Sequence, residues 1–208
     1  QGYEGTDWRK FAKIWTLKIL VHEEGHAAGR VFADGFGKNY SRQEAGYHVD
    51  VPDSAGKPKD TFLGFNEGVT DKISDELLTE YARRTGEISA SDLKWFYELT
   101  QKLEQDGFPY GYLKNIKLVD TVTARLADKN GLSTDVVWGA IKQGFYRGSP
   151  MEDADVKKLF NQNFFPISLD RLAMVKTPEE CGDLTKGLEL LNQIEVEYGP
   201  TELPPSLS

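Results

Sequence analysis

The 208-residue chain lacks several features that would point to common protein classes. Its single cysteine, Cys181, excludes an internal disulfide and a zinc site built from several cysteines. Lys and Arg number 25 against 33 for Asp and Glu, which gives a net charge of -8, and no basic run occurs. Because phosphate contacts need clustered positive charge, this composition argues against a nucleic-acid partner.

Long hydrophobic runs are missing as well. No segment approaches the roughly 18 to 20 apolar residues that are needed to cross a bilayer, so we expect a soluble protein with no membrane partner. The length suits one domain, or a core with an appended helical lobe, and allows a hydrophobic core that needs no metal as a staple. Neither the compartment, cytoplasmic or secreted, nor the oligomeric state follows from the sequence, which begins at Gln1 rather than Met.

Histidine is scarce too, yet two of the three histidines lie in one short motif, His22-Glu23-Glu24-Gly25-His26. The apolar residues before it recur at three- and four-residue steps from Trp8, which predicts a helix that ends near residues 33–37. Residues four positions apart share one face of a helix, so both imidazoles could bind one tetrahedral zinc ion. Glu23 would then face the open side of that ion.

A second motif, Asn66-Glu67-Gly68-Val69-Thr70-Asp71, lies on the next predicted helix, which we expect from about Asn66 to Arg84. A catalytic zinc ion needs three protein ligands and an open fourth position, and two histidines with one glutamate are an established set. Glu67 supplies the missing ligand. The two motifs together therefore predict a catalytic zinc site.

The segment between the two motifs has the composition of a loop with short strands. Tyr47, Val49 and Val51 alternate with polar residues, which is the period of a strand. A second short strand at 61–65 could pair with it as a β-hairpin. We expect this hairpin to lie beside the first helix and to form one wall of a cleft.

The two motifs resemble those of the thermolysin-like gluzincin metallopeptidases, in which HExxH is followed by a helix carrying NExxSD or a close variant. The segment from Phe65 to Asp71 is similar to that second motif, with Thr70 in place of serine. The resemblance implies three zinc ligands: His22, His26 and Glu67. It also implies that Glu23 is the catalytic base and that Asp71 is the carboxylate that orients His22.

The resemblance covers roughly a quarter of the chain, from Leu20 to Ile73. Glu67 follows His26 by 41 positions, a longer separation than in thermolysin itself, which suggests a compact or divergent branch with an inserted hairpin. The expected fold is mainly α: a zincin-like helical metallopeptidase core with a short β-hairpin and an appended C-terminal helical lobe. The expected divisions are a catalytic core at 1–86, the helical lobe at 87–200 and a disordered tail at 201–208.

The C-terminal part reads as a series of helices with clear ends. Helices are expected at 91–105, 112–129 and 133–148, and the last helix should reach Tyr198. Ser149-Pro150-Met151-Glu152 and Thr177-Pro178-Glu179-Glu180 both have the pattern of a capping box with proline at the first helical position.

The expected activity is zinc-dependent hydrolysis of a peptide bond in a protein or peptide substrate, with Glu23 taking the proton of a zinc-bound water. Such a reaction also needs a donor for the developing oxyanion, and family members use a tyrosine, a histidine or an arginine. His48 and Tyr47 in the hairpin are the first candidates for that donor. The second group of candidates is Tyr110, Tyr112, Tyr146 and Arg147.

Two other interpretations remain open at this point. The chain could be a zinc-stabilised scaffold that binds a partner protein through its C-terminal helices without cleaving it, although the complete HExxH argues against this. It could also be a helical domain without metal, in which Glu67 and Asp71 merely stabilise the start of a helix.

Overall fold

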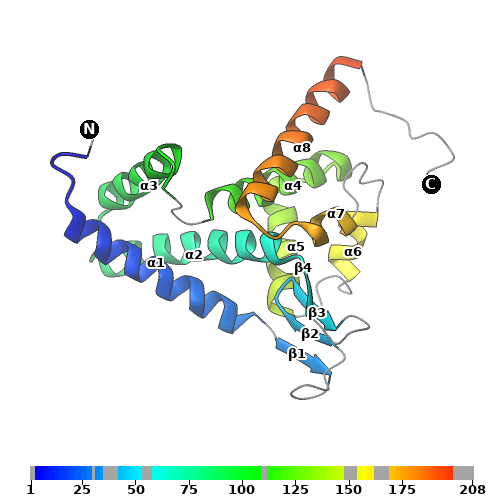
Figure 1. The fold of residues 1–208 in the computed structure, drawn as a ribbon, viewed down its shortest axis with the longest axis horizontal. Helices are drawn as coiled ribbons and strands as arrows, with labels where there is room; N and C mark the ends of the chain where they lie inside the picture. Colours follow the sequence, from blue (N-terminus) through cyan, green and yellow to red (C-terminus); the bar gives the residue numbers. More distant parts are fainter. Residues whose placement is uncertain are drawn as a thin grey trace.

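The computed structural model describes residues 3–29, 31–34, 42–52, 58–108, 112–147, 154–161 and 169–198. Within these ranges the chain is mainly helical, as expected, with one small antiparallel sheet (Figure 1). The helices are α1 (Trp8–Ala28), α2 (Leu63–Thr85), α3 (Ala90–Gln105), α4 (Leu113–Asn130), α5 (Thr134–Arg147), α6 (Ala154–Asn161), α7 (Leu169–Met174) and α8 (Pro178–Tyr198). The strands are β1 (Val31–Asp34), β2 (Arg42–Ala45), β3 (His48–Pro52) and β4 (Pro58–Thr61). Among these described helices none is both long enough and apolar enough to cross a bilayer.

Helix α1 carries the HExxH motif and is shorter than predicted. It begins after Asp7, whose side chain accepts a hydrogen bond from the Lys10 backbone N–H at 3.0 Å. It ends at Ala28 because Gly29 has an extended backbone with a ψ of 132°. The expected end at 33–37 is therefore wrong: residues Val31–Asp34 pair with β2 instead of continuing the helix.

The sheet lies between α1 and α2 in the sequence and has the order β1-β2-β3-β4, all antiparallel. The predicted hairpin is present as β3 and β4, with Val49 opposite Thr61. Its second strand was placed too late, since it spans Pro58–Thr61 and α2 already starts at Leu63. Phe62 makes this change of direction with a left-handed φ of 60°, and its N–H donates to the Ala173 carbonyl at 2.9 Å.

Helix α2 lies between α1 and α4, and two glycines allow the close approach on its two sides (Figure 1). A Cβ on Gly25 of α1 would lie 3.0 Å from the Thr70 methyl group of α2. A Cβ on Gly68 of α2 would lie 2.5 Å from the Asn115 carbonyl oxygen of α4, a distance that real Cβ atoms do not reach. Both approaches occur within one turn of Glu67, so they fix the position of the second motif.

Buried apolar side chains form two clusters, and α2 contributes to both. One cluster joins α1, α2 and α3 and includes Phe11, Leu78 and Phe96. The other cluster joins the remaining helices to the sheet and includes Phe65 and Leu118. Because α2 is shared, the HExxH helix on one side and the C-terminal helices on the other are packed against the same element.

The ends of the C-terminal helices follow the sequence signals where the structure describes them. Thr177 and Glu180 form the predicted capping box: the Glu180 N–H donates to Thr177 Oγ1 at 3.2 Å, and the Thr177 N–H donates to Glu180 Oε2 at 3.1 Å. Gly131 ends α4 with a left-handed φ of 64°. The predicted capping box at 149–152 and the predicted tail at 201–208 lie outside the described residues.

Candidate metal centre

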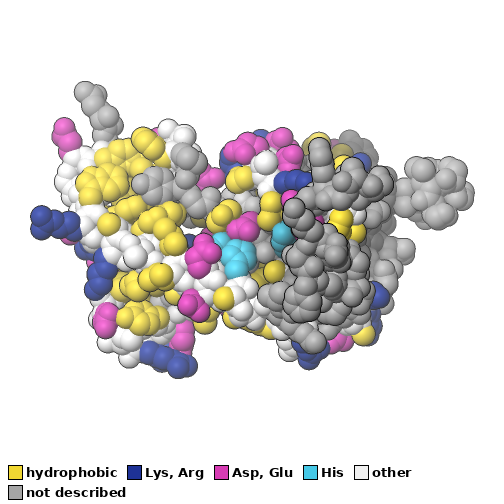
Figure 2. Space-filling model, turned by 60° about the horizontal axis from the view of Figure 1, so that its bottom comes forward, with side chains coloured by type: hydrophobic (Ala, Val, Ile, Leu, Met, Phe, Trp, Pro, Cys, Tyr) yellow, Lys and Arg dark blue, Asp and Glu magenta, His cyan; other side chains and the backbone are white. Residues whose placement is uncertain are grey.

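Three potential metal ligands from two helices come together, as the two motifs predict. His22 and His26 lie on the last two turns of α1, and Glu67 lies in the first turns of α2. Their ligand atoms all lie within 4.8 Å of one another. Histidine side chains lie next to acidic side chains near the middle of the face shown in Figure 2. His22 is buried, whereas the side chains of His26 and Glu67 are 27% and 16% exposed, so the group is reachable from one side.

The spacing of these ligand atoms is close to that of a tetrahedral zinc site. His22 Nε2 lies 3.0 Å from His26 Nε2 and 3.2 Å from Glu67 Oε2, and His26 Nε2 lies 3.4 Å from the same carboxylate oxygen. Ligands about 2.0–2.1 Å from a tetrahedral zinc ion lie about 3.3–3.4 Å from one another. Two imidazoles and one carboxylate are also the donor types that zinc prefers. The donor set therefore fits a single divalent ion.

Asp71 orients His22 from the side opposite the cluster. Its Oδ1 atom lies 3.1 Å from His22 Nδ1, so this nitrogen carries a proton and donates it. The Nε2 atom of His22 is then the one that faces His26 and Glu67. This is the arrangement by which a carboxylate fixes the ring of a metal-binding histidine.

The charges at the cluster shift the pKa values of His22 and Glu67 in opposite directions. Burial lowers the pKa of His22, but hydrogen bonds to Asp71 and Glu67 outweigh it and raise the value to about 9. Burial raises the pKa of Glu67, but hydrogen bonds with His22 and His26 outweigh it and lower the value to about 2. Glu67 is therefore an ionised acceptor over the whole neutral range.

Glu23 follows His22 on α1 and lines a cavity next to it. It is exposed, and together with His22, Asp71 and Tyr112 it lines a cavity of about 390 Å³. Trp15 and Ile19 form the apolar part of the same cavity.

Tyr112 reaches the cluster from the start of α4. Its ring stacks on the His22 ring with the centroids 5.0 Å apart and the planes 8° from parallel. Burial, the negative charge of Glu67 and a hydrogen bond to Glu67 raise the pKa of Tyr112 to about 12. The hydroxyl therefore stays protonated at neutral pH and is a hydrogen-bond donor at the edge of the cluster.

The two residues ranked first as oxyanion donors are engaged elsewhere. Tyr47 is fully buried and its hydroxyl donates to the Ile141 carbonyl at 3.1 Å, so its selection was wrong. The His48 ring lies 3.0 Å from Asp60 across the hairpin, and none of its described side-chain contacts reaches His22, His26 or Glu67. Both backbone N–H groups donate to Asn66, the neighbour of Glu67, at 2.8 and 3.2 Å. The hairpin thus supports the second motif and does not provide a donor to it.

Among the second group of candidate donors, Tyr112 is the described residue that lies against the cluster of His22, His26 and Glu67. Tyr146 is 40% exposed and packs edge-on against Phe145, and Arg147 lies 3.8 Å from Asp155. Tyr110 lies outside the described residues. Tyr112 and His22 are 90 positions apart in the sequence, and no local pattern relates them.

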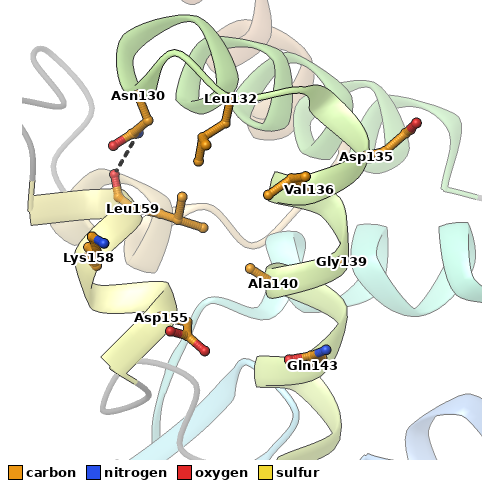
Figure 3. A pocket seen from close by; sticks show the side chains of 10 residues that line it. All are labelled: Asn130, Leu132, Asp135, Val136, Gly139, Ala140, Gln143, Asp155, Lys158 and Leu159. Atoms are coloured by element: carbon orange, nitrogen blue, oxygen red, sulfur yellow. Dashed lines mark hydrogen bonds between the residues drawn. The ribbon is translucent and has the colours of Figure 1, made fainter.

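The described part of the chain also contains a larger pocket, of about 600 Å³, at the other helices (Figure 3). It is lined by the end of α4 together with α5 and α6, and the small residues Gly139 and Ala140 of α5 are among its lining residues. Its described charged side chains are Asp135, Asp155 and Lys158, and no histidine is among its described lining residues. Among the residues of this pocket that the structure describes, no group of potential metal ligands like His22, His26 and Glu67 occurs.

No protein-family model, curated protein or solved structure matches this chain.

Proposed function

We propose that the chain is a zinc-dependent peptidase that hydrolyses peptide bonds in a protein or peptide substrate. The observation that carries the proposal is the meeting of His22, His26 and Glu67, with three ligand atoms 3.0 to 3.4 Å apart. Glu23, which lines the cavity next to His22, adds the group that peptide hydrolysis requires. The hydrogen bond from His22 to Asp71 supports the same assignment.

Each side chain of the site has a role in this proposal. A bound zinc ion supplies a Lewis acid at its open position and makes a water molecule acidic. Glu23 accepts a proton from the attacking water and returns it to the leaving amine. Asp71 holds the His22 ring in one orientation, which keeps the Nε2 lone pair directed at the ligand cluster.

Tyr112 is the oxyanion donor in this proposal and replaces Tyr47 and His48. Its hydroxyl is protonated at neutral pH and lies at the edge of the ligand cluster, where it contacts Glu67. Removing one donor of this kind costs about 10²- to 10³-fold in kcat. We therefore expect Tyr112→Phe to lower kcat by that factor while the zinc content stays at one ion per chain.

The proposal is tested by comparing Glu23→Gln with Glu24→Gln on a peptide library. Glu24 is the adjacent residue, is exposed and carries the same charge, so it is a matched control. Loss of a general base costs about 10² to 10⁴-fold in rate, so Glu23→Gln should be nearly inactive and Glu24→Gln close to wild type. Both variants should keep the zinc, which metal analysis measures.

Two outcomes would contradict the proposal and lead to the alternatives. If wild type binds one zinc ion but neither it nor Glu23→Gln cleaves any peptide, the chain is a zinc-stabilised scaffold for a partner protein. If protein purified without chelators contains no stoichiometric zinc and does not take it up, the helical domain functions without metal.

A further inference from the structure

A line of paired charges continues from the metal centre into the protein, beyond the groups that the proposed reaction uses. On α1, Lys18 precedes His22 by one turn, and on α2, Asp75 follows Asp71 by one turn. The two helices run in opposite directions, so His22 faces Asp71 and Lys18 faces both Asp71 and Asp75. Lys18 is only 7% exposed, which is unusual for a lysine.

The Lys18 ammonium group uses all of its hydrogen-bonding capacity on α2. Its Nζ atom lies 2.9 Å from Asp71 Oδ1, 3.3 Å from the Asp71 backbone oxygen and 2.5 Å from Asp75 Oδ1. An ammonium group has three N–H donors, so no further partner is needed. Its contacts are therefore set by two turns of one neighbouring helix.

The same oxygen of Asp71 contacts both Lys18 and the metal-binding histidine. Asp71 Oδ1 lies 2.9 Å from Lys18 Nζ and 3.1 Å from His22 Nδ1. From α3, the Tyr97 hydroxyl donates to Asp75 Oδ1 at 2.9 Å and holds the second carboxylate. The position of the oxygen that orients His22 is thus determined by a cation that does not touch the metal ligands.

We propose that Lys18 is a positioning residue of the metal centre, which holds the Asp71 carboxylate against His22 so that Nε2 of His22 stays directed at the metal. Without Lys18, Asp71 Oδ1 would lose one of its two charged contacts and keep only His22. The Asp71 carboxylate would then be free to rotate, which weakens its hydrogen bond to His22. The identity of the bound metal in this inference rests on the proposed function.

The test measures zinc affinity by competition with a chromophoric chelator at one fixed pH. Removal of the carboxylate partner of a metal-binding histidine weakens metal binding about 10- to 100-fold. Because Lys18 acts through that carboxylate, we expect a loss at the lower end of this range, about 10-fold, for Lys18→Met. Lys13→Met, at an exposed position of the same helix, is the matched control and should keep wild-type affinity. Equal affinity of Lys18→Met and wild type would overturn the inference.

A second pair of variants separates positioning from a general structural role. Asp75→Asn removes one of the two carboxylates that pair with Lys18 and keeps the ion pair between Lys18 and Asp71. Its zinc affinity should therefore stay within about threefold of wild type. The double variant Lys18→Met/Asp75→Asn should bind zinc as weakly as Lys18→Met, because it restores no cation to Asp71 Oδ1. If Lys18→Met does not fold, the double variant is compared with Asp75→Asn alone, and equal affinities would again overturn the inference.

A spectroscopic measurement keeps this inference independent of the proposed function. In protein prepared without metal, the His22 Nδ1–H proton that is bonded to Asp71 should give a resolved downfield NMR signal at low temperature. That signal should be lost in Lys18→Met and kept in Lys13→Met; a signal retained in Lys18→Met would refute the positioning role. A wild type that takes up no zinc would defeat the proposed function but leave this measurement valid.

Discussion

Metal binding should release a proton near neutral pH, and the proton should come from His22. Hydrogen bonds to Asp71 and Glu67 raise the pKa of His22 to about 9. At pH 7, two units below that value, about 99% of His22 carries a proton on Nε2, the atom that would bind the metal. Glu67, with a pKa of about 2, has no proton to lose. The expected release from His22 at pH 7 is therefore close to one proton per metal ion.

The size of the effect follows from the same pKa value. Each pKa unit corresponds to about 1.4 kcal/mol, so removing the His22 proton at pH 7 costs on the order of 3 kcal/mol, or roughly a hundredfold in affinity. Zinc affinity should therefore rise with pH, about tenfold per pH unit between pH 6 and 8, and level off above about pH 9. Asp71→Asn removes the largest favourable contribution to that pKa and should flatten this dependence.

Calorimetry in two buffers with different ionisation enthalpies measures the number of protons released, and chelator competition measures the affinity across the pH range. Wild type and Asp71→Asn are measured side by side. A zinc affinity that does not change between pH 6 and 8, together with no proton release at pH 7, would refute the reasoning that Asp71 at Nδ1 and Glu67 at Nε2 keep the His22 ring protonated until the metal binds.

Three further predictions concern stability. Gly68→Ala should destabilise the fold by about 3 kcal/mol or more, because the added Cβ would lie 2.5 Å from the Asn115 carbonyl oxygen. Gly139→Ala should stabilise α5 by about 0.5–1 kcal/mol, because a Cβ at this position would have no heavy atom within 4 Å. Urea unfolding of both variants measures the contrast. Without metal, the His22 contribution is fully present below pH 6.5 and lost as pH rises through 9, so wild type should lose more stability than His22→Gln between pH 7 and 9.5, and equal losses would contradict the raised pKa. Thr177→Ala should cost about 1 kcal/mol through loss of the N-terminal bond of α8, measured by the shift in thermal midpoint.

The sequence predicts the elements that local patterns determine. The helical period before His22 and the motif around Glu67 place both ligand helices, because spacing within a helix is a local property. The capping box at Thr177 is found for the same reason. The end of α1 was misjudged because pairing between Val31–Asp34 and β2 is a contact between distant segments.

The choice of hydrogen-bond donor shows the same limit, because it also depends on contacts between distant segments. Tyr47 was favoured because the hairpin was expected to form one wall of the cleft, but its ring lies in the apolar core and its hydroxyl donates to the Ile141 carbonyl. Tyr112 reaches His22 only because Gly68 lets α4 approach α2, a tertiary contact that no period in the sequence encodes. The sequence also gives no sign of the role of Lys18. A lysine one turn before HExxH cannot be told from an ordinary solvated lysine by its sequence position.

The opposed order of charges on α1 and α2 also defines the register of the two helices. Lys18 and His22 on one helix meet Asp71 and Asp75 on the other at steps of one turn. A slip by one turn, about 5.4 Å, would leave a buried charge without its counterpart at one end of the series. The paired charges thus disfavour any one-turn displacement of α1 along α2, and they keep His22 and Glu67 at the same level of the two helices.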